Sequence, residues 1–416
     1  AVREDAQRNH YRSSHAHALP DAQAGLRATP THSSQSSHHR SPPRMLPACE
    51  CAVAASTAMG NLFSSLFGGG AKEPEHWPAF EAKMKSEGCS DAAIAAFKSN
   101  YQQLASGANL MISEWSISPV SSLPSYEDLS AEDPSLLDKT VMLKLNGGLG
   151  TGMGLEKAKS LLTVRDRMTF LDFIAKQTMH MRKQYGVDLA FMLMNSFSTS
   201  ADTLKALKSY RGLAARGLDL EFVQNKAPKV DASDLKPATW EAQPSHEWCP
   251  PGHGDLYPAL VGSGTLDKLL EKGFKYMFVS NSDNLGATMD LKLLTWFANS
   301  GSPFAMECAA RTDADKKGGH LAKGRGGLLL RESAQCPDAD EAKFQDVTRH
   351  KFFNTNNLWI NLEALKASFE KFGGMLPLPV ISNSKTVDPR DKKSTKVLQL
   401  ETAMGAAIEC FPGAQA

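Results

Sequence analysis

The residues best suited to bind phosphate form a cluster of five glycines followed by a lysine. The glycines lie between positions 147 and 154, and Lys159 comes shortly after them. Glycine at this density lets the backbone bend tightly and lets a ligand approach the main chain closely. Successive backbone N–H groups in such a loop can point at phosphate oxygens, and a lysine ammonium can lie over the same oxygens. The pattern therefore predicts a phosphate cradle for a nucleotide.

The loop differs from the two commonest phosphate-binding loops. It lacks the Gly-Lys-Ser/Thr that ends a Walker A loop, and Gly-x-Gly-x-x-Gly, fitted to Gly148 and Gly150, is a weak pattern by itself. A nicotinamide dehydrogenase would need an acidic ribose ligand about twenty residues further on. Asp166 and Asp172 are poor candidates because they fall in a turn and at a helix start. A glycine-rich turn without a ligand is the plain alternative.

Asp283 is the carboxylate best placed to act with this loop. It follows the apolar run 275–280, and Asn284 stands next to it. An aspartate at the end of a strand can hold Mg²⁺ through one carboxylate, while phosphates and waters complete the octahedron. We therefore expect Asp283 to bind Mg²⁺; the alternative is a turn or cap residue.

The elements that must position these residues alternate between strand and helix. Val141 to Leu145 is a short apolar run, typical of a strand buried on both faces. The alternation after it predicts a doubly wound α/β sheet with ligands at the carboxyl ends of the strands. The further elements expected are helices at 91–104, 170–185 and 199–210, strands at 189–194, 218–223, 275–280, 304–310 and 328–331, a loop at 226–249, and a basic loop or solvated hairpin at 316–327.

Composition separates a leader from the rest of the chain. Residues 1–75 are rich in His, Ser, Arg and Pro and end in glycines, which predicts a disordered leader and linker. The leader resembles either an organelle transit peptide or translated sequence upstream of the true start. Met59-Gly60 begins an N-myristoylation pattern, which would act only if translation started at Met59.

Charge and cysteine usage exclude several classes of function. The formal net charge is +1, and 22% of the residues are charged, so no strong field favours nucleic acid. No run of eighteen apolar residues exists, so no membrane-spanning helix is expected. The seven cysteines are mostly scattered, which indicates reduced thiols and a cytoplasmic enzyme rather than a disulfide framework.

The glycine loop also carries a family resemblance. Leu145-Asn-Gly-Gly-Leu-Gly-Thr-Gly-Met-Gly154 with Lys159-Ser160 resembles the signature of UDP-glucose pyrophosphorylases. The wider sugar nucleotidyltransferase pattern has Arg and Pro where this chain has Gly152 and Ala158. This difference favours the UDP-glucose branch over the UDP-N-acetylhexosamine branch. The resemblance extends from about Pro78 to the C-terminus.

The resemblance implies roles for individual residues. Lys159 and Asp283 would be catalytic, and Asp283 would hold Mg²⁺. The nucleotide would be bound by Leu145, Asn146, Gly147, Gly148, Gln224, Gly252 and Asp283, and the sugar phosphate by His253, Asn284, Asn356 and Glu401. A zinc site at His246, Cys249 and His253 is the weaker alternative, since zinc sites usually need a fourth ligand.

The resemblance also implies a fold and a reaction. We expect a Rossmann-like nucleotidyltransferase (GT-A-like) mixed sheet over residues 135–416, preceded by a helical segment at 76–134. The reaction would be uridylyl transfer from UTP to glucose 1-phosphate. The family's second functional lysine and C-terminal β-helix domain are not found before Ala416, so we expect a truncated, monomeric chain. A broad-specificity UDP-sugar pyrophosphorylase and a nucleotide-binding fragment without turnover are the alternatives.

Overall fold

The computed structural model describes residues 73–149 and 157–416 of the chain. The predictions for the leader, for Gly60 and for Gly150, Gly152 and Gly154 lie outside the described residues. Among the described residues, no helix is long and apolar enough to cross a lipid bilayer.

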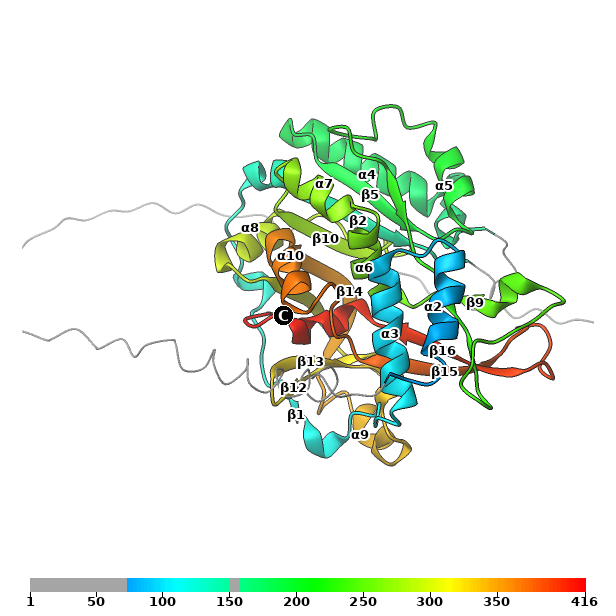
Figure 1. Ribbon diagram of the computed structural model, residues 1–416. Helices are drawn as coiled ribbons and strands as arrows, with labels where there is room; N and C mark the ends of the chain where they lie inside the picture. Colours follow the sequence, from blue (N-terminus) through cyan, green and yellow to red (C-terminus); the bar gives the residue numbers. More distant parts are fainter. Residues whose placement is uncertain (1–72, 150–156) are drawn as a thin grey trace, which may run out of the picture. The chain divides into compact units, whose positions relative to one another are not determined.

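A nine-stranded mixed sheet forms the centre of the described chain (Figure 1). Its strands run in the order β1-β12-β14-β10-β2-β5-β6, while β11 pairs with β14 and β13 with β12. The pairs β10–β2, β2–β5 and β5–β6 are parallel, and β14 is antiparallel to β10. The strands are β1 (Ser118–Pro119), β2 (Thr140–Asn146), β5 (Ala190–Asn195), β6 (Glu221–Val223), β10 (Tyr276–Asn281), β11 (Phe304–Ala310), β12 (His320–Gly324), β13 (Gly327–Arg331) and β14 (Phe352–Asn361).

Helices cover both faces of the parallel strands because side chains along each strand alternate between two apolar layers. Met142, Phe191 and Phe278 pack with α4, α5 and α8. Leu143 and Met192 pack with α6, α7 and α10 on the other face. The helices of the described chain are α2 (Trp77–Ser86), α3 (Asp91–Ala105), α4 (Phe170–Tyr185), α5 (Ser200–Leu207), α6 (Leu256–Gly262), α7 (Thr265–Glu271), α8 (Leu291–Ser300), α9 (Glu341–Phe344) and α10 (Leu362–Lys371).

A second, antiparallel sheet packs against the first two helices. It consists of β15 (Val380–Thr386), β16 (Lys396–Thr402) and β8 (Val230–Asp231). Figure 1 shows α2 and α3 beside β15 and β16, and Phe80, Phe97, Val380 and Leu400 form part of their shared core. The remaining described strands form two small two-stranded sheets. One pairs β3 (Thr163–Arg165) with β4 (Met168–Thr169), and the other pairs β7 (Ala227–Pro228) with β9 (Trp248–Cys249).

Most of the expected elements are confirmed. The prediction of a mixed sheet flanked by helices is correct, and its doubly wound part is the parallel block β6-β5-β2-β10. Thr169 and Asp172 form the capping box of α4. The Thr169 side chain accepts the backbone N–H of Asp172, and the Asp172 side chain accepts the backbone N–H of Thr169, so neither N–H is left without a partner. Ser90 likewise caps α3 by accepting from the Ala93 N–H.

Three expectations are wrong, two in the bounds of an element and one in its type. The strand expected at 218–223 begins only at Glu221, because Leu218 N–H bonds back to Ala215 in a turn. The helix expected to reach residue 210 ends at Leu207, where a turn begins. The loop expected at 226–249 is wrong, because this segment contains β7, β8 and β9. The segment 316–327 follows its alternative prediction of a hairpin, since it contains β12 and the turn into β13, although residues 320–322 are buried rather than solvated.

Candidate active site

A cavity of about 330 Å³ lies at the carboxyl ends of the parallel strands. The sheet brings these ends together because β2, β5, β6 and β10 are neighbours that run the same way. Ligands of open α/β sheets bind at this edge. Its walls are Leu145, Gly147, Gly148, Lys159, Met194, Gln224, Pro250, Gly252, His253, Asn281, Ser282 and Asp283. Eight of these residues were predicted from the sequence.

The glycine loop forms one wall and is anchored at both ends. Ser196 Oγ donates to the Gly147 carbonyl at 2.9 Å, and Lys159 N–H donates to the Gly148 carbonyl at 3.1 Å. The second bond folds Lys159 back so that its aliphatic stem lies beside Gly148. The N–H groups of Gly147 and Gly148 bond to no other described residue. These two donors are therefore available to an anion.

Lys159 and Asp283 face each other across the cavity as a loose ion pair. Lys159 Nζ lies 3.7 Å from Asp283 Oδ2, and the two side chains are 44% and 42% exposed. A pair this open contributes little to stability. Both charges can therefore be redirected to a ligand at small cost to the fold.

The turn at Gly252-His253-Gly254 forms the opposite wall and is pressed against β16. Gly252 has φ of +80°, and a Cβ there would lie 2.6 Å from the Thr402 carbonyl oxygen. A Cβ at Gly254 would lie 2.2 Å from Thr402 Oγ1. Both positions therefore require glycine, one for its backbone angle and both for the close approach.

Gln224 bridges the two walls. Its Nε2 donates to the Gly252 carbonyl at 3.0 Å, and a Cβ at Gly147 would lie 2.6 Å from its Oε1. Gln224 follows β6, and its N–H bonds to the Asn195 carbonyl of β5 at 2.6 Å. The side chain thus lies over the glycine loop at the end of the sheet, where sequence reasoning expected a nucleotide contact.

His253 is held in one neutral tautomer. Its Nδ1 accepts the Met404 N–H at 2.9 Å, so the ring proton resides on Nε2. Burial lowers the pKa of His253 to about 4, because an imidazolium is poorly solvated there. The residue therefore offers the cavity an uncharged N–H donor at neutral pH.

Four predicted residues do not line the cavity. Asn146 is buried and donates to Asn195 Oδ1 and Thr203 Oγ1, while accepting from Ser282 Oγ. Its amide therefore holds the strand ends together beneath the loop. Asn284 accepts the Gly286 N–H within its own turn at 3.1 Å.

The other two are Asn356 and Glu401. Asn356 lies in β14 at the bulge opposite β11, with φ of +59° and a bond from Asn354 Nδ2 to its Oδ1. Glu401 lies on β16 where that strand packs against Gly252. Burial raises the pKa of its carboxyl above the usual range. Their roles toward a sugar stay predictions.

Sequence reasoning missed four lining residues, namely Met194, Pro250, Asn281 and Ser282. Met194 is near the end of β5, and Asn281 ends β10. A rule that takes every residue at the carboxyl end of a parallel strand as a candidate would have found them. Pro250 gives no such signal, since its position depends on the pairing of β7 with β9.

The described lining of the cavity contains one carboxylate, that of Asp283. Among the described residues, no group of three His, Cys, Asp or Glu side chains could hold an ion, so the alternative zinc site is not found. Mg²⁺ is commonly bound by one or two carboxylates, with substrate phosphates and waters as the other ligands. Asp283 beside the glycine loop fits that requirement.

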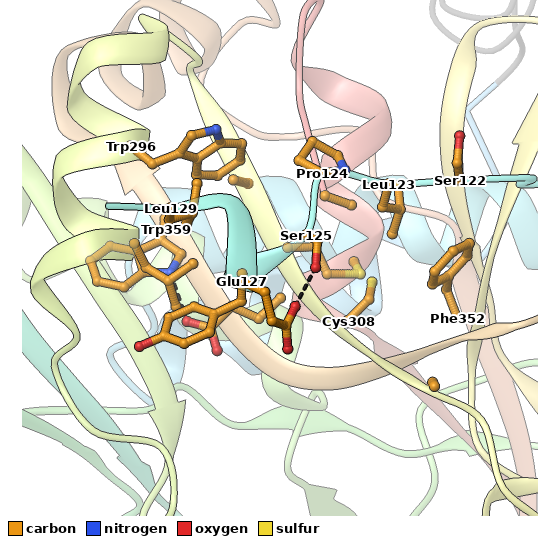
Figure 2. Close-up of a pocket in the computed structure, with 17 residues that line it drawn as sticks. Ser122, Leu123, Pro124, Ser125, Glu127, Leu129, Trp296, Cys308, Phe352 and Trp359 are labelled. Carbon is orange, nitrogen blue, oxygen red and sulfur yellow. Dashed lines mark hydrogen bonds between the residues drawn. The ribbon is translucent and has the colours of Figure 1, made fainter. Parts of the chain in front are cut away.

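A second cavity, of about 570 Å³, has a different character (Figure 2). Trp296, Leu129 and Trp359 lie along one wall, and Phe352 lies on the opposite side of the view. Its half-buried carboxylate, Glu307, accepts from Asn357 Nδ2 and Trp359 Nε1 at 2.9 and 2.7 Å. It shares no lining residue with the first cavity and lacks a lysine or a glycine loop. We therefore place the phosphate chemistry in the first.

A mixed α/β sheet whose parallel strands end at a glycine loop, a lysine and an aspartate is typical of the Rossmann-like nucleotide-binding class. The comparisons narrow this class. A family model described as UTP–glucose-1-phosphate uridylyltransferase matches residues 94–416. The chain therefore belongs to the UTP–glucose-1-phosphate uridylyltransferase family.

Individual relatives agree with this assignment. The UTP–glucose-1-phosphate uridylyltransferase of Solanum tuberosum is 44% identical over 295 residues, which cover 70% of this chain and 60% of that protein. A variant of Leishmania major UDP-glucose pyrophosphorylase, solved with UDP-glucose, is 48% identical with a TM-score of 0.78, covering 82% of this chain and 74% of that one. A UDP-glucose phosphorylase from Trypanosoma brucei is 49% identical with a TM-score of 0.77. The chain spans about 60% of the length of the first curated relatives it matches.

Proposed function

We propose that this chain transfers a uridylyl group from UTP to α-D-glucose 1-phosphate, giving UDP-glucose and pyrophosphate. The observation that carries the proposal is the cavity in which Gly147, Gly148, Lys159 and Asp283 meet. Family membership supports the choice of uridine nucleotide and glucose. The Leishmania major relative that was solved with UDP-glucose supports it further.

The reaction is an in-line displacement. An oxygen of the sugar phosphate attacks the α-phosphorus of UTP, the bond to the bridging oxygen breaks, and pyrophosphate leaves with the electron pair. A phosphate dianion is a competent nucleophile, so no general base is required. Catalysis then consists of positioning and neutralisation of negative charge.

The lining residues divide this work. The free N–H groups of Gly147 and Gly148 would bind phosphate oxygens, and Lys159 would neutralise charge that develops around the α-phosphorus. Gln224 and Gly252, which already bond to each other, would contact the uracil edge. The neutral Nε2–H of His253 would position the sugar phosphate without competing with Lys159 for charge.

Asp283 would hold Mg²⁺ beside the glycine loop. When bound there, Mg²⁺ acts as a Lewis acid that neutralises phosphate charge. The Lys159–Asp283 pair must open for this to occur, and its 3.7 Å separation and half-exposed side chains make opening easy.

Pyrophosphate release from UTP, glucose 1-phosphate and Mg²⁺ tests the proposal. The Leishmania major enzyme serves as the positive control, since this chain covers about three quarters of it. Release by this chain would support transfer. Sugar 1-phosphates other than glucose 1-phosphate, assayed in parallel, separate a glucose-specific enzyme from a broad UDP-sugar pyrophosphorylase.

A nucleotide-binding fragment without turnover is the second candidate, because the free N–H groups of Gly147 and Gly148 and the Lys159 ammonium could bind phosphates without any transfer step. Calorimetric titration with UTP and UDP-glucose distinguishes it. Binding without pyrophosphate release would establish the fragment. Folded protein that neither binds nor turns over would contradict both proposals.

A further inference from the structure

Asp255 is a buried carboxylate beside the candidate active site that no step above uses. It directly follows the Gly252-His253-Gly254 turn and is only 4% exposed. Both of its oxygens accept hydrogen bonds from one residue. Asn225 N–H donates to Oδ2 at 2.7 Å, and Asn225 Nδ2 donates to Oδ1 at 2.9 Å. No described cation forms an ion pair with it.

Asn225 connects this carboxylate to the cavity. It is the residue after Gln224, whose side chain lines the cavity and donates to the Gly252 carbonyl. Strand β6 ends at Val223, and Gln224 N–H makes the last bond to β5. Beyond that point, the Asp255 bonds are what fix the chain at position 225. Two parallel connections therefore join the end of β6 to the 252–255 turn.

An ionised carboxylate suits this place better than a neutral group. Only a carboxylate presents two acceptor oxygens to two N–H donors. An asparagine would turn an NH₂ toward one of them and leave both groups unpaired in a buried site. Burial without a cation is costly for a charge, and it raises the pKa of Asp255 to about 7. The Asp255 carboxylate is thus retained next to the turn that forms a cavity wall, despite the free-energy cost of burying its charge. This indicates that it has a role in the site.

We propose that Asp255 is a positioning residue for nucleotide binding: through Asn225 it fixes Gln224 against Gly252 and so sets the spacing of the two cavity walls. The inference depends on the proposed function, because it assumes that the uridine half of the ligand lies between these walls. It predicts an effect on affinity rather than on the chemical step.

The Asp255→Asn variant tests this with UDP-glucose as the probe. UDP-glucose is a diphosphate diester and does not titrate between pH 6 and pH 8, unlike the terminal phosphate of UTP. Calorimetric titration at pH 8 should show UDP-glucose bound about tenfold more weakly than by wild type, as expected for two lost hydrogen bonds. At saturating substrates, turnover should stay within about threefold of wild type.

The pH dependence gives a readout that a purely structural role would not change. Several titratable groups lie near Asp255. Cys89 interacts with it electrostatically, Lys226 lines the same small cavity, His253 precedes it by two residues, and Glu401 is next to Thr402, which also lines that cavity. Burial raises the pKa of Cys89 and lowers that of His253 to about 4, so both stay uncharged from pH 6 to pH 8. Lys226 pairs with Glu87 and lies over the Trp248 ring.

Wild-type affinity should therefore fall as the pH drops through about 7, because protonated Asp255 loses one acceptor. The Asp255→Asn variant should show no such slope. Since burial also raises the pKa of Glu401, a Glu401→Gln variant separates the two carboxyls, and it should keep the slope.

Matched variants guard against a simple folding defect. Asp172 is a comparable carboxylate: it accepts one backbone N–H, from Thr169, and two side-chain hydroxyls, those of Thr169 and Tyr210. Asp172→Asn should lower the melting temperature and leave UDP-glucose affinity unchanged. Asn225→Ala keeps the backbone N–H donor to Asp255 and removes the side-chain Nδ2 donor, so the affinity of this variant for UDP-glucose should fall by about threefold. It serves as the test if Asp255→Asn does not fold.

The outcomes are distinct. Unchanged affinity in folded Asp255→Asn, or in Asn225→Ala where only that variant folds, would overturn the positioning role and leave the proposed function intact. Two kinetic results together would support the positioning role. At subsaturating substrate, the rate of the variant should fall by the same factor as its affinity, and at saturating substrate its turnover should be preserved. Wild-type protein that does not bind UDP-glucose at any pH would overturn the proposed function and this inference together.

Discussion

Two groups of charged side chains in this chain are built in opposite ways. In the cavity, Lys159 and Asp283 lie 3.7 Å apart and remain nearly half exposed. Around Glu114, the charges are closely paired; Glu114 and Arg331 are buried, and Arg349 reaches them from a side chain that is 41% exposed. Glu114 is 3% exposed and lies 2.7 Å from Arg331, 2.5 Å from Arg349 and 3.0 Å from His350.

The difference separates a structural cluster from a binding site. Glu114, a residue of the segment before β1, joins Arg331 of β13 to Arg349 and His350 before β14. Its oxygens have no capacity left for a ligand. Lys159 and Asp283 satisfy each other only weakly and keep their hydrogen-bonding groups facing solvent. Charges that a protein leaves incompletely paired at the edge of a sheet are the ones available for substrate.

The largest effect should come from breaking the buried cluster. Glu114→Gln leaves Arg331 without its short carboxylate partner in a fully buried position. Loss of one partner of a buried ion pair costs about 3–5 kcal/mol. Urea unfolding should show that loss. Glu81→Gln, which breaks the exposed Glu81–Lys85 pair, is the control and should unfold like wild type.

The loose pair should behave in the reverse manner. Lys159→Ala should lower turnover by about 100-fold, because a transition-state charge loses its counter-charge, while stability changes little. Steady-state kinetics should show turnover falling far more than the KM for UTP rises. Lys157→Ala is the control, since Lys157 is exposed and does not line the cavity. Equal losses in turnover and affinity would contradict a transition-state role for Lys159.

A smaller effect is expected at the wall between the cavity and β16. Gly254→Ala places a methyl group 2.2 Å from Thr402 Oγ1, so β16 or the turn must move. Overpacking of this kind costs about 1–3 kcal/mol, and the shift should also raise the KM. At Gly326 a Cβ meets nothing within 4 Å. Gly326→Ala should therefore match wild type in melting temperature and KM. If Gly254→Ala behaved like Gly326→Ala, the close contact between position 254 and Thr402 would be disproved.

The smallest effect concerns acid sensitivity of the buried cluster. His320 and His350 stack with ring centroids 3.8 Å apart, and burial lowers the pKa of His320 to about 2. At pH values between about 2 and the unfolded-state pKa of 6.5, His320 binds a proton in the unfolded chain but not in the folded chain. Stability is therefore lost as the pH falls below 6.5.

His320→Phe should remove one such proton while keeping a ring in place. The loss of unfolding free energy between pH 7.5 and pH 5.5 should shrink by about 1 kcal/mol. Urea unfolding at both pH values measures it. An unchanged difference between the two pH values would show that His320 is not the group responsible.

The sequence was sufficient for the features that depend on local order. The apolar run at 141–145, the capping box at Thr169 and Asp172, and Asp283 at a strand end all follow from neighbouring residues, and the structure has them there. The prediction that Lys159 lies beside the loop is also correct, because Lys159 follows Leu149 by only ten positions.

The features that failed depend on partners far away in the chain. Residues 226–249 looked like a surface loop because they are polar and contain prolines, yet Val230 pairs with Leu398 of β16 and is fully buried. Nothing near Asn146 indicates that its amide is used by Asn195, Thr203 and Ser282. Positions 252 and 254 require glycine because of Thr402, about 150 residues later, which no local pattern reveals.

That separation also has a consequence for the timing of assembly during protein synthesis. The Met404 N–H that holds the His253 ring is 151 residues further along the chain. At about 5–20 residues per second, a ribosome needs about 10–30 s to translate that distance. β2, β5, β6 and Lys159 exist before this interval begins, and β10 and Asp283 are translated early in it, while the His253 ring still lacks its anchor. The cavity is thus completed by a segment that is translated well after its other walls, and a nascent chain must keep one wall of it open until β16 and Met404 have been translated.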